Sequence, residues 1–451
     1  MKKLLLLACA AVGCCSAYAQ NQLDKYTTGT NTFTEIGGSA QGVNNPHDLD
    51  FVPGRPNECW VLNKEANGGS VVLFFNTGKS NQAHQFRRDS HNEHFMARAV
   101  ALAFGDNDYF VSAQEIKSTA GPTATFMGPA LWSSDTAIFA RMHQNNWVSG
   151  QLLGSHIDML HQSPFGMGVA HNNANVYWYF DGHNGNICKY DFATPHGIGE
   201  DDHSDGKIHR YTDVTVTRKP NVPSHMVVDK QNNWLYYADG GTGRVLRMKT
   251  TSGTVGANLA VPSTGAEPLA EYKAVTGATN EVMVSGLTSP CGVDYRKDRL
   301  IVSDYSTGII HIYNTTTAPA TLVGTIITGG PGVMGVRITD DNKIWYVNAT
   351  TSKFMRIDNP NVVSVEEAVA ENISYAVYPN PVHDNLNIKI DNVTATDKAN
   401  IRIFDVTGKQ VYANATGDNI TTVNTSSWAK GMYNVVLSFN NSTEVTKVVI
   451  Q

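Results

Sequence analysis

The sequence is poor in charge, in cysteine and in long apolar runs. Charged residues make up 16% of the 451 residues, and 34 basic against 40 acidic residues give a formal net charge of -6. No run of Lys or Arg follows the first three residues, so the chain lacks the basic surface that a phosphate backbone requires, and nucleic acid is excluded as an expected partner. No later segment reaches the roughly 20 apolar residues of a membrane-spanning helix, so we expect no transmembrane segment.

Cysteine and the common catalytic motifs are scarce as well. Beyond the N-terminal segment only Cys59, Cys188 and Cys291 remain. This odd number permits at most one disulfide and a free thiol, which excludes a disulfide framework. The sequence holds no Gly-x-Ser-x-Gly elbow, no His-Glu-x-x-His pair and no phosphate loop. Any hydrolase chemistry would therefore depend on a metal or on carboxylates.

The N-terminus is typical of an export signal. The stretch MKKLLLLACAAVGCCSAYAQ combines two lysines, a short apolar run and Ala-Tyr-Ala at positions 17–19. Signal peptidase accepts this small-x-small pattern, so residues 1–19 are predicted to be a signal peptide, cleaved before Gln20. The alternative is a lipoprotein, although the residues before each candidate cysteine fit a lipobox poorly: Cys9, Cys14 or Cys15.

Internal repeats predict the architecture of the middle of the chain. The 39 glycines and many turns rich in Asn and Asp favour short strands over helices. Five segments share a turn, a short apolar strand, a polar turn, a strand rich in Trp, Tyr, Val and Ile, an Asp or Asn with Gly, and a third strand: NPHDLDFVPGRPNECWVLNKEANGGSVVLFF, SPFGMGVAHNNANVYWYFDGHNGNICKYDF, VPSHMVVDKQNNWLYYADGGTGRVLRMKT, SPCGVDYRKDRLIVSDYSTGIIHIYNT and GPGVMGVRITDDNKIWYVNATTSKFMRID. A sixth, more divergent copy starts at Ala97. Such meanders must stack on neighbours, so we expect an all-β chain with a six-bladed β-propeller at residues 40–360, after a lead-in at residues 20–39.

Three of the repeats share a further signature. It reads ADGGTGRVLRM from Ala238 and SDYSTGIIHIY from Ser303, and more loosely FDGHNGNICKY from Phe180. In these segments the chain resembles the NHL-repeat type of six-bladed β-propeller, over about residues 40 to 360. Propellers of this kind include scaffolds, sugar lactonases and amidating lyases, so the resemblance implies a fold rather than one activity.

A second β domain is predicted near the C-terminus. The segments YPNPVHDNLNIKI, ANIRIFDVTGKQVY and GMYNVVLSFNNSTEVTKVVIQ alternate apolar and polar residues, with Thr407-Gly408 as a hairpin turn. This pattern predicts a small immunoglobulin-like β-sandwich of seven or eight strands at residues 374–451. A polar linker is predicted at residues 361–373.

The same C-terminal segment carries three motifs in order. They are a Tyr-Pro-Asn-Pro start, a Phe-Asp-x-x-Gly-Lys turn and a Lys-Gly-x-Tyr strand, followed by a lysine in the last strand: Tyr378, Pro379, Asn380, Pro381, Phe404, Asp405, Gly408, Lys409, Lys430, Gly431, Tyr433 and Lys447. In these motifs the segment resembles the C-terminal sorting domain (Por type) of the type IX secretion system of Bacteroidota; a generic adhesive sandwich is the alternative. The resemblance implies the type IX machinery as a partner and export through the periplasm, ending in secretion or attachment at the outer-membrane surface.

Candidate site residues lie where the innermost strands of a propeller begin, because these positions point into one mouth of the axial channel. In the six repeats they are His47 and Asp48, Arg98, Phe165 and Gly166, Ser224 and His225, Cys291, and Met334. His47 and His225 come from opposite repeats and are candidate ligands of a divalent metal such as zinc, with the third ligand unaccounted for. Alternatively, both histidines hydrogen-bond backbone groups, and Asp48 caps a neighbouring strand.

Two histidine-rich stretches lie outside these positions. ATPHGIGEDDHSDGKIHRY, from Ala193, interleaves three histidines with four acidic residues: His196, His203, His209, Glu200, Asp201, Asp202 and Asp205. Its acidic core suggests a calcium turn, but the spacing does not follow the EF-hand loop, so we interpret it as a solvated loop. RRDSHNEHF, from Arg87, is interpreted as a surface loop.

Two functions from different classes remain open. In the first, the exported propeller binds an extracellular glycan, peptide or protein at its rim and channel mouth, an interpretation favoured by the lack of a complete catalytic set. In the second, it is a metal-dependent lactonase or lyase whose site is formed by His47, Asp48, Arg98 and His225. The metal would activate a water or polarise a carbonyl, and Arg98 would hold an anionic substrate. The sequence does not determine whether the protein is an enzyme.

Overall fold

The computed structural model describes residues 21–117, 126–141, 153–261, 268–362, 375–390, 398–439 and 442–451. Its chain divides into two compact units, Met1–Val363 and Ser364–Gln451. The predicted signal peptide and most of the predicted linker lie outside the described residues. Strands dominate both units, and the described helices are two 3-10 turns and the four-residue α1 (Asn92–Phe95), so the all-β prediction is confirmed. No described helix is long and apolar enough to cross a membrane.

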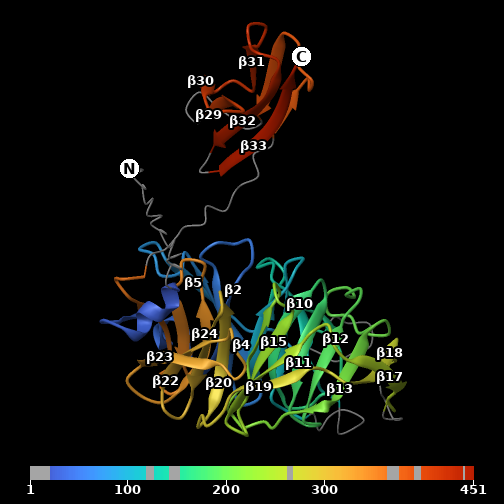
Figure 1. The fold of residues 1–451 in the computed structure, drawn as a ribbon. Helices are drawn as coiled ribbons and strands as arrows, with labels where there is room; N and C mark the ends of the chain where they lie inside the picture. Colours follow the sequence, from blue (N-terminus) through green and yellow to red (C-terminus); the bar gives the residue numbers. More distant parts are fainter. Residues whose placement is uncertain are drawn as a thin grey trace, which may run out of the picture. The chain divides into compact units, whose positions relative to one another are not determined.

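In the first unit the described strands form six sheets, numbered here 1 to 6 along the chain (Figure 1). Sheets 1 and 2 contain β2 (Pro46–Phe51), β3 (Cys59–Lys64), β4 (Gly69–Phe75) and β5 (Ala83–Arg87), then β6 (Ala99–Phe104), β7 (Tyr109–Gln114), β8 (Ala130–Ser133) and β9 (His156–Met159). Sheets 3 and 4 contain β10 (Gly166–Asn173), β11 (Val176–Asp181), β12 (Asn186–Asp191) and β13 (Lys207–Thr215), then β14 (Met226–Asp229), β15 (Trp234–Asp239), β16 (Arg244–Lys249) and β19 (Asn280–Val284). Sheets 5 and 6 contain β20 (Pro290–Arg296), β21 (Arg299–Asp304), β22 (Ile309–Asn314) and β23 (Thr321–Ile327), then β24 (Val333–Ile338), β25 (Ile344–Asn348), β26 (Lys353–Asp358) and β1 (Thr32–Gly37). Sheet 3 is extended by β18 (Glu271–Thr276), which is parallel to β13, and by β17 (Thr254–Asn258).

The innermost strands of these sheets contact one another in a closed order. β2 contacts β6, β6 contacts β10, and the contacts continue through β14, β20 and β24 back to β2. Neighbouring sheets bury their faces against each other: Trp60 of sheet 1 meets Phe104 and Phe110 of sheet 2, with ring centroids 5.3 and 5.2 Å apart. This closed ring of stacked meanders is a β-propeller, as the sequence predicted.

The ring is closed by a strand from the N-terminal lead-in. β1 pairs antiparallel with β26, so residues predicted as a separate lead-in at 20–39 supply the outer strand of sheet 6. The preceding 3-10 helix η1 (Gln22–Thr27) buries Leu23 and Tyr26, and the Tyr26 hydroxyl donates to the carbonyl of Ile357 at 3.2 Å. This pairing was missed because β1 is short and mostly exposed.

Glycine and bulges bring the innermost strands together at the axis. A Cβ on Gly335 would lie 2.6 Å from Asp48 Oδ1, and a Cβ on Gly292 would lie 2.2 Å from the Met334 carbonyl oxygen. The register shifts where β2 starts, between Pro46 and Asp48, and similar shifts occur at the starts of β6, β10, β20 and β24. Each shift is a bulge that leaves a residue outside the ladder. His47 is the bulged residue of β2, which explains why its side chain can turn toward the channel.

The second unit has two sheets around one apolar core. One sheet contains β27 (Tyr375–Tyr378), β28 (Asn385–Ile390) and β31 (Ile420–Asn424), and the other contains β30 (Gln410–Thr416), β29 (Ala399–Asp405), β32 (Gly431–Phe439) and β33 (Ser442–Ile450). Leu386, Ile388 and Ile390 of the first sheet pack in one cluster with Ile401 and Val435 of the second. The predicted alternation of β28 is therefore seen in the structure, with its apolar residues inside and Asn385 and Lys389 exposed.

The three cysteines of the described residues are all free and buried. Burial raises the pKa of the Cys188 and Cys291 thiols to about 12, so both stay protonated at neutral pH. Cys291 Sγ lies 3.2 Å from the Val333 carbonyl oxygen, which identifies this channel cysteine as a small packed side chain.

Candidate functional site

The structure brings three of the four candidate site residues together inside the channel. His47, Asp48 and His225 are each at most 2% exposed, and His225 Nδ1 lies 3.5 Å from Asp48 Oδ1. The fourth, Arg98, is only partly buried and lies among other cations beside this group. The predicted positions therefore divide into a buried channel interior and a partly exposed mouth.

Asp48 is the centre of the interior. Its Oδ2 accepts the backbone N–H of Leu102 in sheet 2 at 3.0 Å, and its Oδ1 accepts the N–H of Leu49 at 2.9 Å. The same Oδ1 faces His225 of sheet 4 and Arg337 of sheet 6, the latter at 3.6 Å. The Asp48 carboxylate thus contacts sheets 2, 4 and 6 in addition to its own sheet 1. Its bond to Leu102 is the kind of strand capping that the sequence analysis gave as an alternative.

The two channel imidazoles are neutral at neutral pH. Burial and the nearby Lys64 ammonium lower the pKa of His47 to about 3. Burial also lowers the pKa of His225, although Asp48 opposes this shift. His47 Nδ1 lies 3.0 Å from the Asn45 carbonyl oxygen and His225 Nε2 lies 3.0 Å from the Val100 carbonyl oxygen, so these nitrogens donate. These bonds agree with the alternative stated above, in which both histidines hydrogen-bond backbone groups.

Arg337 is a channel residue that the sequence analysis missed. Its side chain is 11% exposed, and its Nε donates to Asp50 Oδ1 at 3.1 Å. Burial alone would lower its pKa, but Asp48, Asp50 and Asp294 together raise the pKa above its ordinary value, so Arg337 stays charged. The sequence signal that could have identified Arg337 was a charged residue inside the apolar strand VMGVRI.

The channel mouth holds a group of cations near one carboxylate, here called the basic mouth: Lys64, Arg98, Arg218, Glu115 and Asn221. Glu115 contacts the Lys64 ammonium and lies 3.3 Å from Arg218 NH1, and it accepts the Asn221 backbone N–H at 2.8 Å. Asn221 Oδ1 in turn accepts from Lys64 at 3.1 Å and from Arg98 at 3.0 Å. Within this group three cations accompany one carboxylate, so the mouth attracts anions.

The elements of the ring explain where these side chains point. Lys64 ends β3, Glu115 follows β7, and Arg98 precedes β6, so all three lie where strands meet the same mouth. Arg218 extends from the turn before sheet 4, with its guanidinium carbon 4.1 Å from the centroid of the Phe165 ring. Burial and the neighbouring Arg98 and Arg218 lower the pKa of Lys64, while Glu115 raises it. Only Arg98 and Phe165 were found by position in the repeat.

Aspartates of the repeat signature are engaged by backbone N–H groups or by arginine side chains. Asp304 Oδ2 accepts the N–H groups of Thr288 and Ser289 at 2.8 and 3.2 Å. Asp181 contacts the Arg210 guanidinium, and Asp239 lies 2.9 Å from Arg244 NH2. These carboxylates are 0–1% exposed, so they do not neutralise the exposed cations of the mouth.

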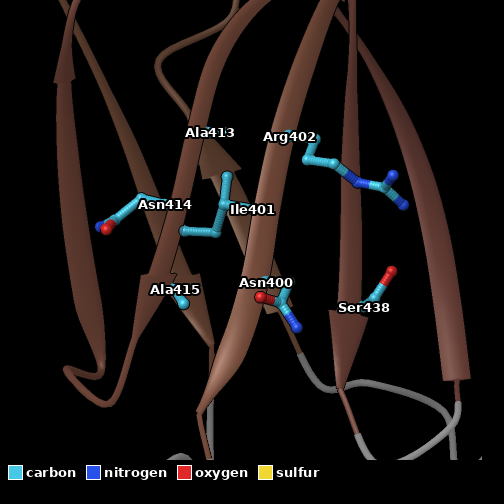
Figure 2. A pocket seen from close by; sticks show the side chains of 7 residues that line it. All are labelled: Asn400, Ile401, Arg402, Ala413, Asn414, Ala415 and Ser438. Carbon is cyan, nitrogen blue, oxygen red and sulfur yellow. The ribbon is translucent and has the colours of Figure 1, made fainter.

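Two hollows lie away from the channel. One is on the first unit between sheets 1 and 2 and is lined by residues 52–55 and 104–109 and by Ser134. The other is on the second unit, over β29 and β30 (Figure 2). It is lined by amides, aliphatic side chains and one guanidinium: Asn400, Ile401, Arg402, Ala413, Asn414, Ala415 and Ser438. Neither hollow contains a catalytic combination of side chains.

The predicted sorting motifs have clear structural roles in the second unit. The Asn380 side chain donates to the Lys447 carbonyl at 3.0 Å and accepts the Val449 N–H at 2.9 Å, which fixes the start of the unit to its last strand. Asp405 Oδ1 accepts the N–H groups of Thr407 and Lys409 at 2.9 and 3.0 Å and so shapes the hairpin turn. Gly408 supplies the left-handed conformation there, with φ of 84°.

Known structures with similar folds share little sequence with this chain. An auxiliary nutrient binding protein from Bacteroides ovatus is 10% identical over 73% of this chain and 77% of its own, with a TM-score of 0.45. PorZ, an essential surface component of the type-IX secretion system of Porphyromonas gingivalis, is 14% identical over 91% of this chain and 60% of its own, with a TM-score of 0.38. Virginiamycin B lyase from Staphylococcus aureus is 9% identical over 73% of this chain and 100% of its own, with a TM-score of 0.41.

The comparisons by sequence concern smaller parts of the chain. Ulvan lyase NLR42 from Nonlabens ulvanivorans is 28% identical over 113 residues, which are 25% of this chain and 18% of the lyase. Residues 376–451 match the model of the secretion system C-terminal sorting domain, a span that contains all three motifs. These residues are therefore a type IX secretion sorting domain, and the chain is exported by that system to the cell surface or to the medium.

Proposed function

We propose that this exported propeller is a binding module that captures an anionic extracellular ligand at the basic mouth. The observation that carries the proposal is the imbalance of charge there: Lys64 and Arg218 pair with one carboxylate, that of Glu115, while Arg98 bonds to the Asn221 side chain. Glu115 itself is held by an Asn221 N–H and two cations, so Arg98 remains available to a carboxylate, sulfate or phosphate group. A glycan, peptide or protein with such groups fits this mouth.

The position of Arg98 supports a preorganised contact. Its backbone has a φ of 52°, a conformation that few non-glycine residues adopt. It is fixed there by two backbone bonds, from the Arg98 N–H to the Gly68 carbonyl at 2.9 Å and from the Glu115 N–H to the Arg98 carbonyl at 3.2 Å. A guanidinium on a fixed backbone loses less entropy when it binds a ligand.

The proposed architecture is a six-bladed propeller at residues 40–360 followed by an immunoglobulin-like sandwich at residues 374–451. The six sheets and the closed order of their inner strands support the blade count. The two sheets around one core support the sandwich. In this arrangement the propeller binds the ligand and the sandwich serves export.

A metal-dependent lactonase or lyase centred on His47, Asp48, Arg98 and His225 is the second candidate. Its support is that His47 Nε2 and His225 Nδ1 are buried nitrogens without a hydrogen bond to any described residue. Against it, Arg337 already places a positive charge 3.6 Å from Asp48, which lowers the attraction of this group for a cation. The first candidate is therefore preferred.

Binding to arrays of acidic glycans and acidic peptides, followed by calorimetry on the mature full-length chain, tests the preferred function. We expect Arg98→Ala to weaken binding about tenfold, which is about 1.4 kcal/mol, and we expect raised salt to weaken wild-type binding. Arg296→Ala is the matched control, because Arg296 pairs with Asp340 outside the mouth. Equal binding by both variants would contradict the proposal.

Metal analysis tests the second candidate. Plasma mass spectrometry of the wild type, His47→Ala and His225→Ala chains measures any ion that depends on the channel. One ion per chain that is lost in both variants would favour the enzyme and justify screening lactones. Metal content unchanged by both substitutions would leave the binding module.

A further inference from the structure

A cluster of histidines joins the edge of sheet 2 to a loop of sheet 3 and contains none of the channel residues described above. His156 begins β9, the edge strand of sheet 2, and His196 and His203 lie in the loop between β12 and β13. One ligand atom from each of the three lies within 4.8 Å of the others. Among the described residues, these three histidines are the group of at least three His, Cys, Asp or Glu side chains that meets this distance. The group of His47, Asp48 and His225 does not meet it.

The fold packs these histidines much more tightly than the sequence suggested. His156 is 0% exposed and His203 is 4% exposed, so the predicted solvated loop is wrong for His203, whereas His196 is partly exposed. Two acidic side chains of the loop accept hydrogen bonds from the loop's own backbone. Glu200 accepts the Gly197 N–H at 3.1 Å, and Asp202 accepts the Ser204 N–H at 3.1 Å. Both carboxylates are therefore engaged within the loop.

The backbone fixes the tautomers of two of the rings. His156 Nδ1 lies 2.8 Å from the Leu153 carbonyl oxygen, and His196 Nδ1 lies 2.6 Å from the Gly197 carbonyl oxygen. A carbonyl oxygen accepts only from a protonated nitrogen, so each Nδ1 carries the hydrogen and each Nε2 presents a lone pair. His156 Nε2 is buried and makes no hydrogen bond to a described residue. A carbonyl behind each imidazole is the usual outer support of a metal-binding histidine.

The spacing of the nitrogens fits one ion. His196 Nε2 and His203 Nε2 are 3.2 Å apart. With zinc–nitrogen bonds of about 2.0–2.1 Å, two corners of a tetrahedron lie about 3.3 Å apart. The ring centroids of His156 and His196 are 5.1 Å apart, which places the third imidazole beside the first two.

We propose that His156, His196 and His203 bind one divalent transition-metal ion, with zinc favoured, and that this ion joins the edge of sheet 2 to the β12–β13 loop of sheet 3. Three imidazoles without a thiolate or an engaged carboxylate suit zinc, copper or nickel rather than calcium or magnesium. A tetrahedral ion with three protein ligands keeps its fourth position for water or an external ligand. The site differs from the proposed ligand mouth in location and in chemistry.

Titration of the mature full-length chain with zinc, after treatment with a chelator, tests the site. We expect one zinc ion per chain with a Kd of about 10 µM or tighter, and at least about 100-fold weaker binding by His196→Ala and by His203→Ala. Cobalt should give the visible absorption of a tetrahedral ion in the wild type and lose it in both variants. His209→Ala is the control, because His209 pairs with Glu271 at 3.0 Å, outside the cluster.

Thermal unfolding separates a metal site from packed but metal-free imidazoles. Zinc should raise the melting temperature of the wild type and of His209→Ala, and should leave that of His196→Ala unchanged. His196 is the preferred position for substitution because it is only partly buried, so its variant should fold. Absence of zinc binding by the wild type, or equal binding by His196→Ala and His203→Ala, would overturn the proposal.

Discussion

The channel interior and the basic mouth are neighbours, yet they use charge in opposite ways. In the interior, the carboxylates of Asp48, Asp50 and Asp294 surround Arg337 and accept backbone N–H groups of adjacent sheets. In the mouth, the buried Lys64 and the partly exposed Arg218 share the carboxylate of Glu115, and the partly exposed Arg98 bonds to Asn221. A buried layer of hydrogen-bonded carboxylates around one cation holds the sheets together, whereas cations nearer solvent retain charge for a ligand. Backbone hydrogen bonding and exposure, rather than residue type, separate structural charge from binding charge.

The largest expected effect comes from removing the interior cation. Arg337→Met should lower the free energy of unfolding by about 3 kcal/mol, because it leaves three carboxylates without their shared partner. Urea unfolding measures the loss. Arg296→Met is the control and should cost less than about 1 kcal/mol, because its partner Asp340 has an 89% exposed side chain. Equal losses would show that the interior charges are no more structural than a surface pair.

A smaller effect is expected from crowding the axis. Gly335→Ala should lower the free energy of unfolding by about 2 kcal/mol, because its Cβ would lie 2.6 Å from Asp48 Oδ1 and 2.9 Å from Asp48 Cα. In Gly256→Ala, the control, the nearest atom lies at an ordinary 3.6 Å. Comparison of the two melting temperatures measures the difference. A neutral Gly335→Ala would mean that sheets 1 and 6 can separate without cost.

The interior should also respond to pH. Burial raises the pKa of Asp294 to about 6, although Arg337 opposes this shift. Because the folded-state pKa exceeds the unfolded one, the folded state holds more protons between about pH 4 and pH 6, and stability falls as pH rises through this window. We expect this fall, of up to about 1.4 kcal/mol per pH unit, to be absent in Asp294→Asn. Urea unfolding at several pH values measures both slopes, and parallel slopes would contradict the assignment.

The smallest effect on stability is expected in the mouth. Arg98→Ala should change the free energy of unfolding by about 0.5 kcal/mol or less, because the side chain is partly exposed and its recorded hydrogen bond is to the exposed Asn221. The same variant should show the tenfold weaker ligand binding described above. A large loss of stability with unchanged binding would reverse the assigned roles of mouth and interior.

Local patterns in the sequence predicted much of the fold. Alternation located strands such as β28, and the Asp of the repeat signature located the turn in which Asp304 Oδ1 accepts the N–H groups of Ser306 and Thr307. The bulge that starts β2 brings His47 and Asp48 to the axis, as their position in the repeat indicated. These features depend on a few neighbouring residues, so the sequence carries them directly.

Contacts between distant segments could not be predicted in the same way. Lys64, Glu115 and Arg218 come from three different connections, and only the closed ring brings them to one mouth. His156 showed no pattern that linked it to His196, because the stacking of sheets 2 and 3 creates their contact. Arg337 was overlooked because a single charge in an apolar strand acquires a role only when two other strands, β2 and β20, supply its partners.

The pairing of β1 with β26 has a consequence for how this molecule is made. Thr34 contacts Asp358 across 324 positions of the chain, so the first strand to be synthesised must wait for one of the last strands of the unit. Until β1 pairs with β26, the outer edge of sheet 6 is unpaired and the ring of sheets is open. Ring closure is therefore a late event with a high loop-closure cost. A nascent chain interrupted before β26 lacks the strand with which β1 pairs.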